Sequence, residues 1–263
     1  MFDLAQLESS LAGSIFAGHL HFSAVTESTN TDTLAAARAG APHGSVFFAD
    51  EQLAGRGRGD HAWHSASGQG LYVSVLLRPE FPAAVLPLLP LASGLAAADA
   101  IRAVSDLSAD IRWPNDLLIG PRKVGGILVE AKSDGVNVAY AVVGIGINVH
   151  QRDFAADLST PATSLDLEFG RRVSRQTLLA SLLKSLQRES LGLLDPAAPE
   201  SIPTRLLQAS TWITEREVEV HGPQACSGVT DGLDRNGFLR VRTSTGLVIV
   251  QTGGIREMPV SSC

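Results

Sequence analysis

"ADIRWPNDLLIGPRKVGGILVEAKSDG", residues 109–135, is the stretch that decides the fold class. A strand enters at its start and is predicted to end at Pro114, because proline cannot donate a hydrogen bond to a sheet. The two segments that follow read as a hairpin, with Gly120, Pro121 and Arg122 at its turn. Strands joined by so short a turn run antiparallel.

Further strands and helices surround this hairpin. Several strands follow one another with helices between only some of them. That order favours an α+β protein, with a mixed or antiparallel sheet and helices on one face, over a doubly wound parallel sheet. Strands are expected at 19–26, 44–52, 70–79 and 138–149, and helices at 28–40, 84–104 and 174–194, with a shorter helix to about residue 210.

The pattern changes after residue 213. Segments such as "REVEVHG" and "LVIVQTGGI" alternate in polarity and are separated by Gly, Asp and Asn turns. This predicts a small all-β barrel over 214–263, next to a larger domain over 1–213.

The composition predicts a soluble cytoplasmic protein. Apolar residues make up 44% of the 263 residues and charged residues 18%, enough for a core. The formal net charge of −6 opposes binding along a phosphate backbone. Cys226 and Cys263 provide neither a disulfide framework nor a cysteine zinc site, which fits a reducing compartment.

Neither a secretory signal nor a membrane span is expected. The N-terminus has no basic region followed by an apolar one. The longest apolar stretch, residues 83–101, is interrupted by Pro87, Pro90, Gly94 and Asp99, so we predict a buried helix there.

The segment "AGRGRGDHAWHS", residues 54–65, admits three interpretations. It is an arginine-glycine tract for nucleic acid, a mobile loop that closes over a small anion, or an exposed turn. Its glycines free the backbone, and Arg56 and Arg58 add positive charge. No Gly-Lys-Ser/Thr follows, so it is not a Walker-type loop.

Two sites on the hairpin stretch could carry chemistry. Asn115 and Asp116 stand where a strand stops, and Asp116 is a candidate Mg²⁺ ligand, with an Asx turn as the alternative. Lys123 precedes Gly125 and Gly126, whose missing side chains leave room for a ligand. The alternative for Lys123 is a solvated hairpin lysine.

The segment "GIGIN", residues 144–148, places two glycines in a strand, which indicates close approach of another group. It lacks a third glycine and a following helix, which excludes a Rossmann dinucleotide site.

Taken together, these motifs resemble a biotin protein ligase. The motifs that carry the resemblance are "ESTN" (27–30), "EQLAGRGR" (51–58), Trp63, "WPND" (113–116), "RKVGGILVE" (122–130) and "GIGINV" (144–149).

The resemblance implies a fold and a reaction. The fold is a catalytic domain similar to class II aminoacyl-tRNA synthetases with an SH3-like C-terminal barrel. The reaction joins biotin and ATP into biotinyl-5′-AMP, with Mg²⁺, and then transfers biotin to a lysine of a carboxyl carrier domain of acetyl-CoA carboxylase or a related carboxylase. A lipoate or octanoate ligase or transferase of the same fold is the nearest alternative. An RNA-binding module and a catalytically inactive biotin sensor are the others.

The resemblance also implies roles for individual residues. Lys123, Arg58 and Asp116 are the implied catalytic residues, with Lys123 between the biotin carboxylate and the α-phosphate. The implied biotin-binding residues are Ser28, Thr29, Gln52, Gly55, Arg56, Arg58, Lys123 and Gly126. The implied adenylate-binding residues are Trp63, Asn115, Asp116, Lys123, Gly144, Gly146 and Asn148.

Two departures from the family pattern stand out. Family members usually continue the loop with a glycine and a basic residue after the Arg-Gly-Arg core, where this chain has Gly59, Asp60 and His61, and we expect Asp60 to weaken the hold on the adenylate. Arg112 stands where lysine is more usual. Because the motifs begin at residue 27, we expect the short form of the family, without an N-terminal DNA-binding domain and without DNA as a partner. A homodimer is left open.

Overall fold

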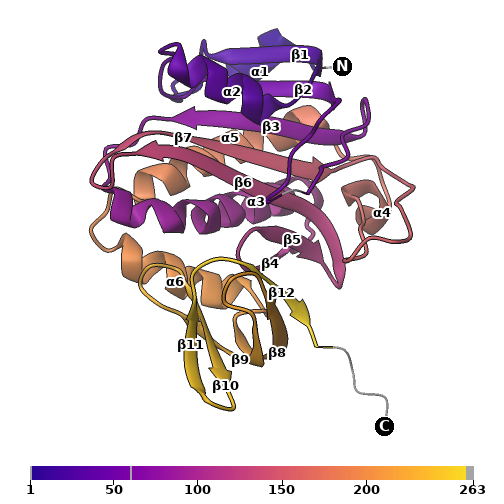
Figure 1. The fold of residues 1–263 in the computed structure, drawn as a ribbon. Coiled ribbons are helices and arrows are strands. Elements are labelled where there is room, and N and C mark those ends of the chain that lie inside the picture. Colours follow the sequence, from indigo (N-terminus) through magenta and orange to yellow (C-terminus); the bar gives the residue numbers. More distant parts are fainter. Residues whose placement is uncertain (1, 60, 259–263) are drawn as a thin grey trace.

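The computed structural model describes residues 2–59 and 61–258, and its strands form two sheets (Figure 1). The larger sheet has the order β1-β2-β3-β7-β6-β5-β4. Only β1 and β2 pair in parallel, and its other neighbours are antiparallel, so the predicted mixed α+β sheet is confirmed. Its strands are β1 (Leu20–Thr26), β2 (Val46–Gln52), β3 (Gly70–Leu77), β4 (Asp110–Arg112), β5 (Asp116–Ile119), β6 (Arg122–Ser133) and β7 (Val138–Asn148).

The predicted hairpin is β5 and β6, which pair antiparallel. Gly120 turns the chain between them with a φ of +57°, a conformation that glycine adopts without a steric penalty. Strand β6 then pairs with β7 along almost its whole length. The hairpin is thereby joined to the centre of the sheet.

Helices cover both faces of this sheet. In β3, Val75 and Leu77 face the main core, which includes helices α3 and α5, while Leu76 faces the other side and packs with Ala37 of α2. The prediction of helices on one face is therefore wrong for α2. The helices are α1 (Leu4–Ser10), α2 (Thr29–Arg38), the 3₁₀ helix η1 (Ala83–Leu88), α3 (Leu89–Ser105), α4 (Leu165–Phe169), α5 (Arg175–Gly192) and α6 (Ala198–Ala209).

The apolar segment is a core helix, as predicted. The continuous helical stretch Ala83–Ser105 contains an 18-residue window with a mean hydropathy of 1.7, so it is long and apolar enough to cross a membrane by length and composition alone. Within the structure, 67% of its apolar window is buried against the rest of the protein. Packing in the core therefore accounts for its composition.

The C-terminal strands form an antiparallel sheet of their own, at the bottom of Figure 1. Its order is β11-β10-β9-β8-β12. Pairing of β11 with β12 is not among the strand pairings of residues 2–59 and 61–258, so the predicted strands are confirmed but closure into a barrel is not. These strands are β8 (Thr214–His221), β9 (Cys226–Leu233), β10 (Leu239–Thr243), β11 (Gly246–Val250) and β12 (Gly254–Glu257).

Candidate active site

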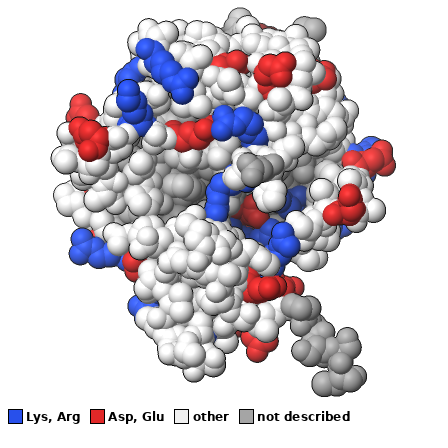
Figure 2. Space-filling view, viewed as in Figure 1, with Lys and Arg blue, Asp and Glu red and all other residues white. Residues whose placement is uncertain are grey.

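A cavity of about 830 Å³ opens on the α2 face of the large sheet. Its floor includes Gly144 and Gly146 of β7, which alternate with Ile145 and Ile147 of the main core. Basic and acidic side chains gather around a hollow on this face (Figure 2). The glycine loop and residues from 151–162 complete the wall, together with residues of the C-terminal sheet and its loops.

The motifs that are scattered along the sequence meet at this cavity. The predicted site residues that line it are Ser28, Thr29, Gln52, Arg56, Arg58, Trp63, Asn115, Asp116, Lys123, Gly126, Gly144, Gly146 and Asn148.

Gly55 is the predicted site residue that does not line the cavity. It is buried beneath the loop, where a Cβ atom would collide with the backbone oxygen of Trp63 and lie 2.7 Å from Oγ of Ser65. The backbone N–H of Trp63 also donates to the carbonyl of Gly55 at 2.8 Å. Gly55 thus allows the loop to fold back on itself, and its predicted contact with biotin is not supported. Asp60 lies outside the described residues.

A cluster of uncharged polar groups occupies one end of the cavity. Oε1 of Gln52, at the end of β2, accepts from the backbone N–H of Thr29 at 2.9 Å and from its hydroxyl at 3.1 Å. Nε2 of Gln52 donates to the hydroxyl of Ser65 at 2.7 Å. Ser28, the N-cap of α2, is 2% exposed and its side chain makes no cap hydrogen bond. Fixed donors and acceptors of this kind suit an uncharged polar ring.

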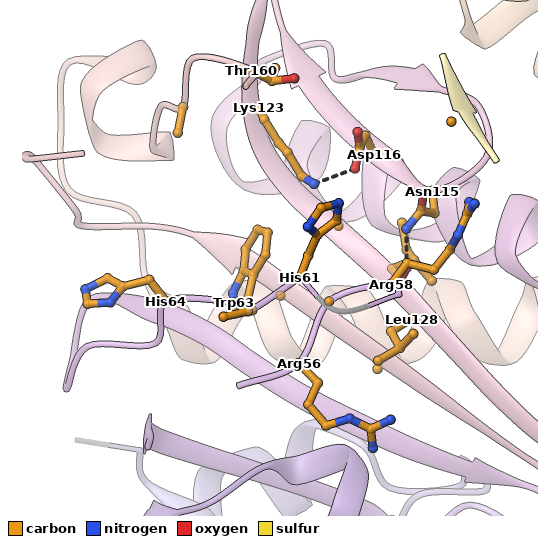
Figure 3. Close-up of a pocket in the computed structure, with 18 of the residues that line it drawn as sticks. Arg56, Arg58, His61, Trp63, His64, Asn115, Asp116, Lys123, Leu128 and Thr160 are labelled. Carbon is orange, nitrogen blue, oxygen red and sulfur yellow. Dashed lines mark hydrogen bonds and ion pairs between the residues drawn. The ribbon is translucent and has the colours of Figure 1, made fainter. Parts of the chain in front are cut away.

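Arg56 and Arg58 point in different directions from the glycine loop (Figure 3). Arg56 is 44% exposed at its side chain and pairs with Glu130 at 2.7 Å. Arg58 is more buried and donates to the carbonyl of Gly253. Burial lowers the pKa of Arg58, and the charge of Asp116 offsets part of that shift. Arg58 is thus a poorly hydrated cation facing the cavity, which favours an anionic ligand.

The centre of the cavity holds a carboxylate between two cations. Nζ of Lys123 lies 2.5 Å from Oδ1 of Asp116, the ion pair dashed in Figure 3. Nη2 of Arg112 lies 2.6 Å from the other oxygen, Oδ2. Burial raises the pKa of Asp116, but Lys123 and Arg112 outweigh it, so its net pKa lies below the usual value. Asp116 is therefore ionised at neutral pH.

This arrangement does not fit a resident Mg²⁺ on Asp116. Each of its oxygens is paired with a cation, and the charges of Lys123 and Arg112 together already exceed that of the carboxylate, so they repel a further divalent cation. Among residues 2–59 and 61–258, no group of three or more His, Cys, Asp or Glu side chains is placed to hold a metal.

The two glycines of β7 make room for protein side chains. A Cβ atom on Gly146 would lie 2.6 Å from the indole of Trp63, and one on Gly144 would collide with the amide of Asn30. Trp63 also lies with its ring centroid 5.5 Å from Nζ of Lys123. The close approach that the sequence predicts is therefore observed, and the approaching groups are Trp63 and Asn30.

Two asparagines are held by backbone carbonyls. Nδ2 of Asn148 donates to the carbonyl of Thr163 at 3.0 Å, and Nδ2 of Asn115 donates to that of Ile127 at 2.8 Å. Each amide is thereby oriented in the cavity wall by a contact from another segment.

Two parts of the wall come from segments that the sequence motifs do not include. Residues 151–162 run beside Lys123, whose N–H donates to the carbonyl of Pro161 at 2.8 Å. The other part comes from the C-terminal sheet and includes His221, Gly253 and Arg256. Neither segment carries a motif, so only the tertiary contacts reveal them.

Comparisons with known proteins identify relatives of this chain. The Biotin/lipoate A/B protein ligase family matches residues 22–148. The biotin–[acetyl-CoA-carboxylase] ligase of Mycobacterium tuberculosis is 32% identical over 238 residues, which cover 88% of this chain and 86% of that protein. The bifunctional ligase/repressor BirA of Bacillus spizizenii is 35% identical over 70% of this chain, but the match spans only 57% of its own length.

A solved structure is similar to this chain as well. The biotin protein ligase of Aquifex aeolicus, in complex with biotin and ATP, is 28% identical with a TM-score of 0.78, and the match covers 91% of this chain and 98% of that one. Given a relative matched over most of both chains, and a shared fold around a cavity built from the predicted motifs, the chain belongs to the biotin protein ligase family.

Proposed function

We propose that this protein activates biotin with ATP and transfers it to a lysine of a biotin carboxyl carrier domain. One observation carries the proposal. A single cavity holds both the uncharged polar cluster around Gln52 and the cations Arg58 and Lys123. The first suits the ureido ring of biotin, and the second suits carboxylate and phosphate oxygens.

In the first step, a biotin carboxylate oxygen attacks the α-phosphorus of ATP, and pyrophosphate leaves. Negative charge develops on oxygens at the reacting phosphate, so fixed cations lower the barrier. An ammonium has three N–H donors, and Asp116 takes one from Lys123. The remaining two are available to an oxygen of each reactant. Arg58 supplies further positive charge from the glycine loop.

In the second step, the neutral amine of the carrier lysine attacks the carbonyl carbon of biotinyl-5′-AMP. AMP leaves with the electron pair of the cleaved bond, and the amine loses a proton to solvent. The same cations stabilise the departing phosphate. The exposed side of the cavity, beside Arg56, leaves room for the carrier lysine.

We propose that Mg²⁺ enters the site bound to the phosphates of ATP. The engaged oxygens of Asp116 argue against a resident ion there, and every step above is assigned to side chains of the chain itself.

The remaining parts of the proposal concern organisation and partners. We assign residues 1–213 to the catalytic unit and 214–263 to a small unit of the SH3-like type, whose closed barrel is an inference from the family. The carrier domain is that of acetyl-CoA carboxylase, the substrate in the name of the M. tuberculosis relative. DNA is not included as a ligand, because the net charge of −6 opposes it. We also propose a cytoplasmic location, because Cys226 and Cys263 provide no disulfide framework, which fits a reducing compartment.

The test is incubation with labelled biotin, ATP, Mg²⁺ and the carrier domain of an acetyl-CoA carboxylase. Label is expected on the carrier, with release of pyrophosphate, and none on a carrier whose acceptor lysine is replaced by arginine. Unlabelled lipoate and octanoate in excess should not compete. A carrier without label under these conditions would overturn the proposal, and competition by lipoate would favour the alternative ligase.

A further inference from the structure

We propose that Arg112 is a positioning residue for adenylation, which fixes Asp116 so that Asp116 in turn fixes Lys123. This inference rests on the proposed function, because it concerns the lysine that serves the first step. No motif of the sequence analysis assigned a role to Arg112.

The geometry of the carboxylate is the first argument. Arg112 donates to Oδ2 of Asp116 from Nη2 at 2.6 Å and from Nε at 3.2 Å. Lys123 takes the other oxygen at 2.5 Å. Each oxygen therefore serves one cation, and the carboxylate is held from both sides by charge-assisted contacts.

Arg112 is itself held by two other parts of the chain. It is 7% exposed, its guanidinium lies 5.2 Å from the ring centroid of Trp212, and Nη2 also donates to the hydroxyl of Thr160 at 2.9 Å. Arg216, the third residue of β8, lies over the same Trp212 ring at 4.2 Å. The position of Arg112 thus depends on the loop that contains Thr160 and on the start of the C-terminal sheet.

The side chain of Lys123 is held by fewer contacts than that of Arg112, so its position depends on Asp116. Its side chain is 28% exposed and sits on a flexible four-carbon stem. Among the described residues, Asp116 is the only carboxylate with which Lys123 forms an ion pair. A lysine at position 112 would supply a point charge, without the guanidinium over the Trp212 ring or the several N–H donors that reach both Asp116 and Thr160.

The charges around Asp116 predict a signature in the pH dependence. Lys123 on β6, Arg112 on β4 and Arg58 in the glycine loop are the charged groups that act on it. Lys123 and Arg112 hold the pKa of Asp116 below its usual value against the effect of burial. Loss of Arg112 removes one of these cations, so the pKa of Asp116 rises. Protonated Asp116 no longer holds Lys123, and the acid limb of the rate profile moves to higher pH.

The experiment measures pyrophosphate release against pH for the wild type, Arg112→Met and Arg112→Lys. Arg122→Met is the matched control, because Arg122 is the residue before Lys123 on β6, is 49% exposed and pairs with Glu168 rather than with Asp116. A shift of about 1 Å in a catalytic group can reduce a rate about a hundredfold. We therefore expect kcat to fall about a hundredfold in Arg112→Met, with KM for biotin near the wild-type value. The acid limb should move to higher pH, and Arg112→Lys should recover part of both changes.

Two results would overturn the inference while the wild type is active. One is an Arg112→Met protein whose kcat and acid limb match those of Arg122→Met. The other, which applies if Arg112→Met does not fold, is an Arg112→Lys protein with a normal circular dichroism spectrum and an unmoved acid limb. A wild type that releases no pyrophosphate with biotin and ATP overturns the proposed function instead, and this inference with it.

Discussion

Gly144 and Gly146 show how much a single residue type can predict. A glycine inside a strand indicates that another group comes close to the backbone. The structure bears this out, because Trp63 and Asn30 lie against these positions. A glycine indicates that the space of a Cβ atom is free, but it does not identify the group that occupies this space. Their predicted contact with the adenylate therefore stays a prediction. Gly146 can affect the adenylate through Trp63, which lies against it.

The substitution Gly146→Ala tests whether Gly146 shapes the adenylate site through Trp63. The new methyl group would lie 2.6 Å from the indole, so Trp63 must move away from the floor of the cavity. Because Trp63 is the predicted wall of the adenylate site, we expect KM for ATP to rise about tenfold, within the range known for small misplacements, and KM for biotin to change less. Steady-state pyrophosphate release measures both.

Gly192→Ala is the control for this substitution, because no atom lies within 4 Å of a Cβ atom built there. Equal values of KM for ATP in Gly146→Ala and the wild type would mean that Trp63 does not shape the ATP site.

At the scale of elements, α2 is the instructive case. A cap at Ser28, Thr29 or Asn30 and the glycine at position 40 predict a helix, and the structure has one at Thr29–Arg38. The prediction that all helices lie on one face of the sheet is wrong for this helix. Strands β1 and β2 turn out to be parallel neighbours, so α2 is the crossover between them. The strong preference for right-handed crossovers then decides the face, and that preference applies only once the pairing is known.

This placement brings the first turn of α2 to the cavity, where Thr29→Val should weaken biotin binding. The hydroxyl of Thr29 lies 3.1 Å from Oε1 of Gln52 and 2.8 Å from the hydroxyl of Ser74, and Thr29 is 5% exposed. Valine leaves these buried groups short of a partner, at a cost of about 1–3 kcal/mol. We expect part of this to appear as a roughly tenfold rise in Kd for biotin, measured by titration calorimetry.

Thr33→Val provides the comparison within the same helix. Thr33 is buried, but its hydroxyl bonds the carbonyl of Thr29 inside the helix. It should lose stability and keep its affinity for biotin. Similar losses of affinity in both variants would show that α2 contributes only stability.

For the molecule as a whole, charge and shape separate the remaining interpretations of the arginine-glycine loop. The net charge is −6, and Arg56 is already paired with Glu130. The other loop arginine, Arg58, is directed to the C-terminal sheet through Gly253. Neither forms part of an exposed basic stripe of the kind that follows a phosphate backbone.

We therefore expect no DNA complex to survive at about 200 mM salt, where binding through phosphate contacts alone becomes weak. An electrophoretic mobility shift with duplex DNA, repeated over a salt series, measures this. A band that persists at that salt concentration would assign the loop, or another surface, to nucleic acid after all.

Most elements could be predicted because their signals are local, and the predicted site residues follow from the resemblance of the motif set to a known family. Caps, turns and apolar periodicity act within a few residues. They predict the hairpin, the core helix at Ala83–Ser105 and the strands of the C-terminal sheet, and the motif set supplies about half of the residues that line the cavity. The first helix, Leu4–Ser10, was missed, because seven residues with one buried leucine carry little periodicity.

The sequence by itself determined the α+β class, the family motifs and the residue types that a carboxylate and a phosphate require. Only the tertiary structure decided which contacts those residues make. It set α2 on the second face, buried Gly55 under its own loop, and joined Arg112 to Asp116 and Trp212. Each of these contacts links segments whose relative placement depends on the whole packing, or on the geometry of a folded loop. Local propensities do not determine contacts between distant segments, so the sequence alone allows several contact partners for each of these residues.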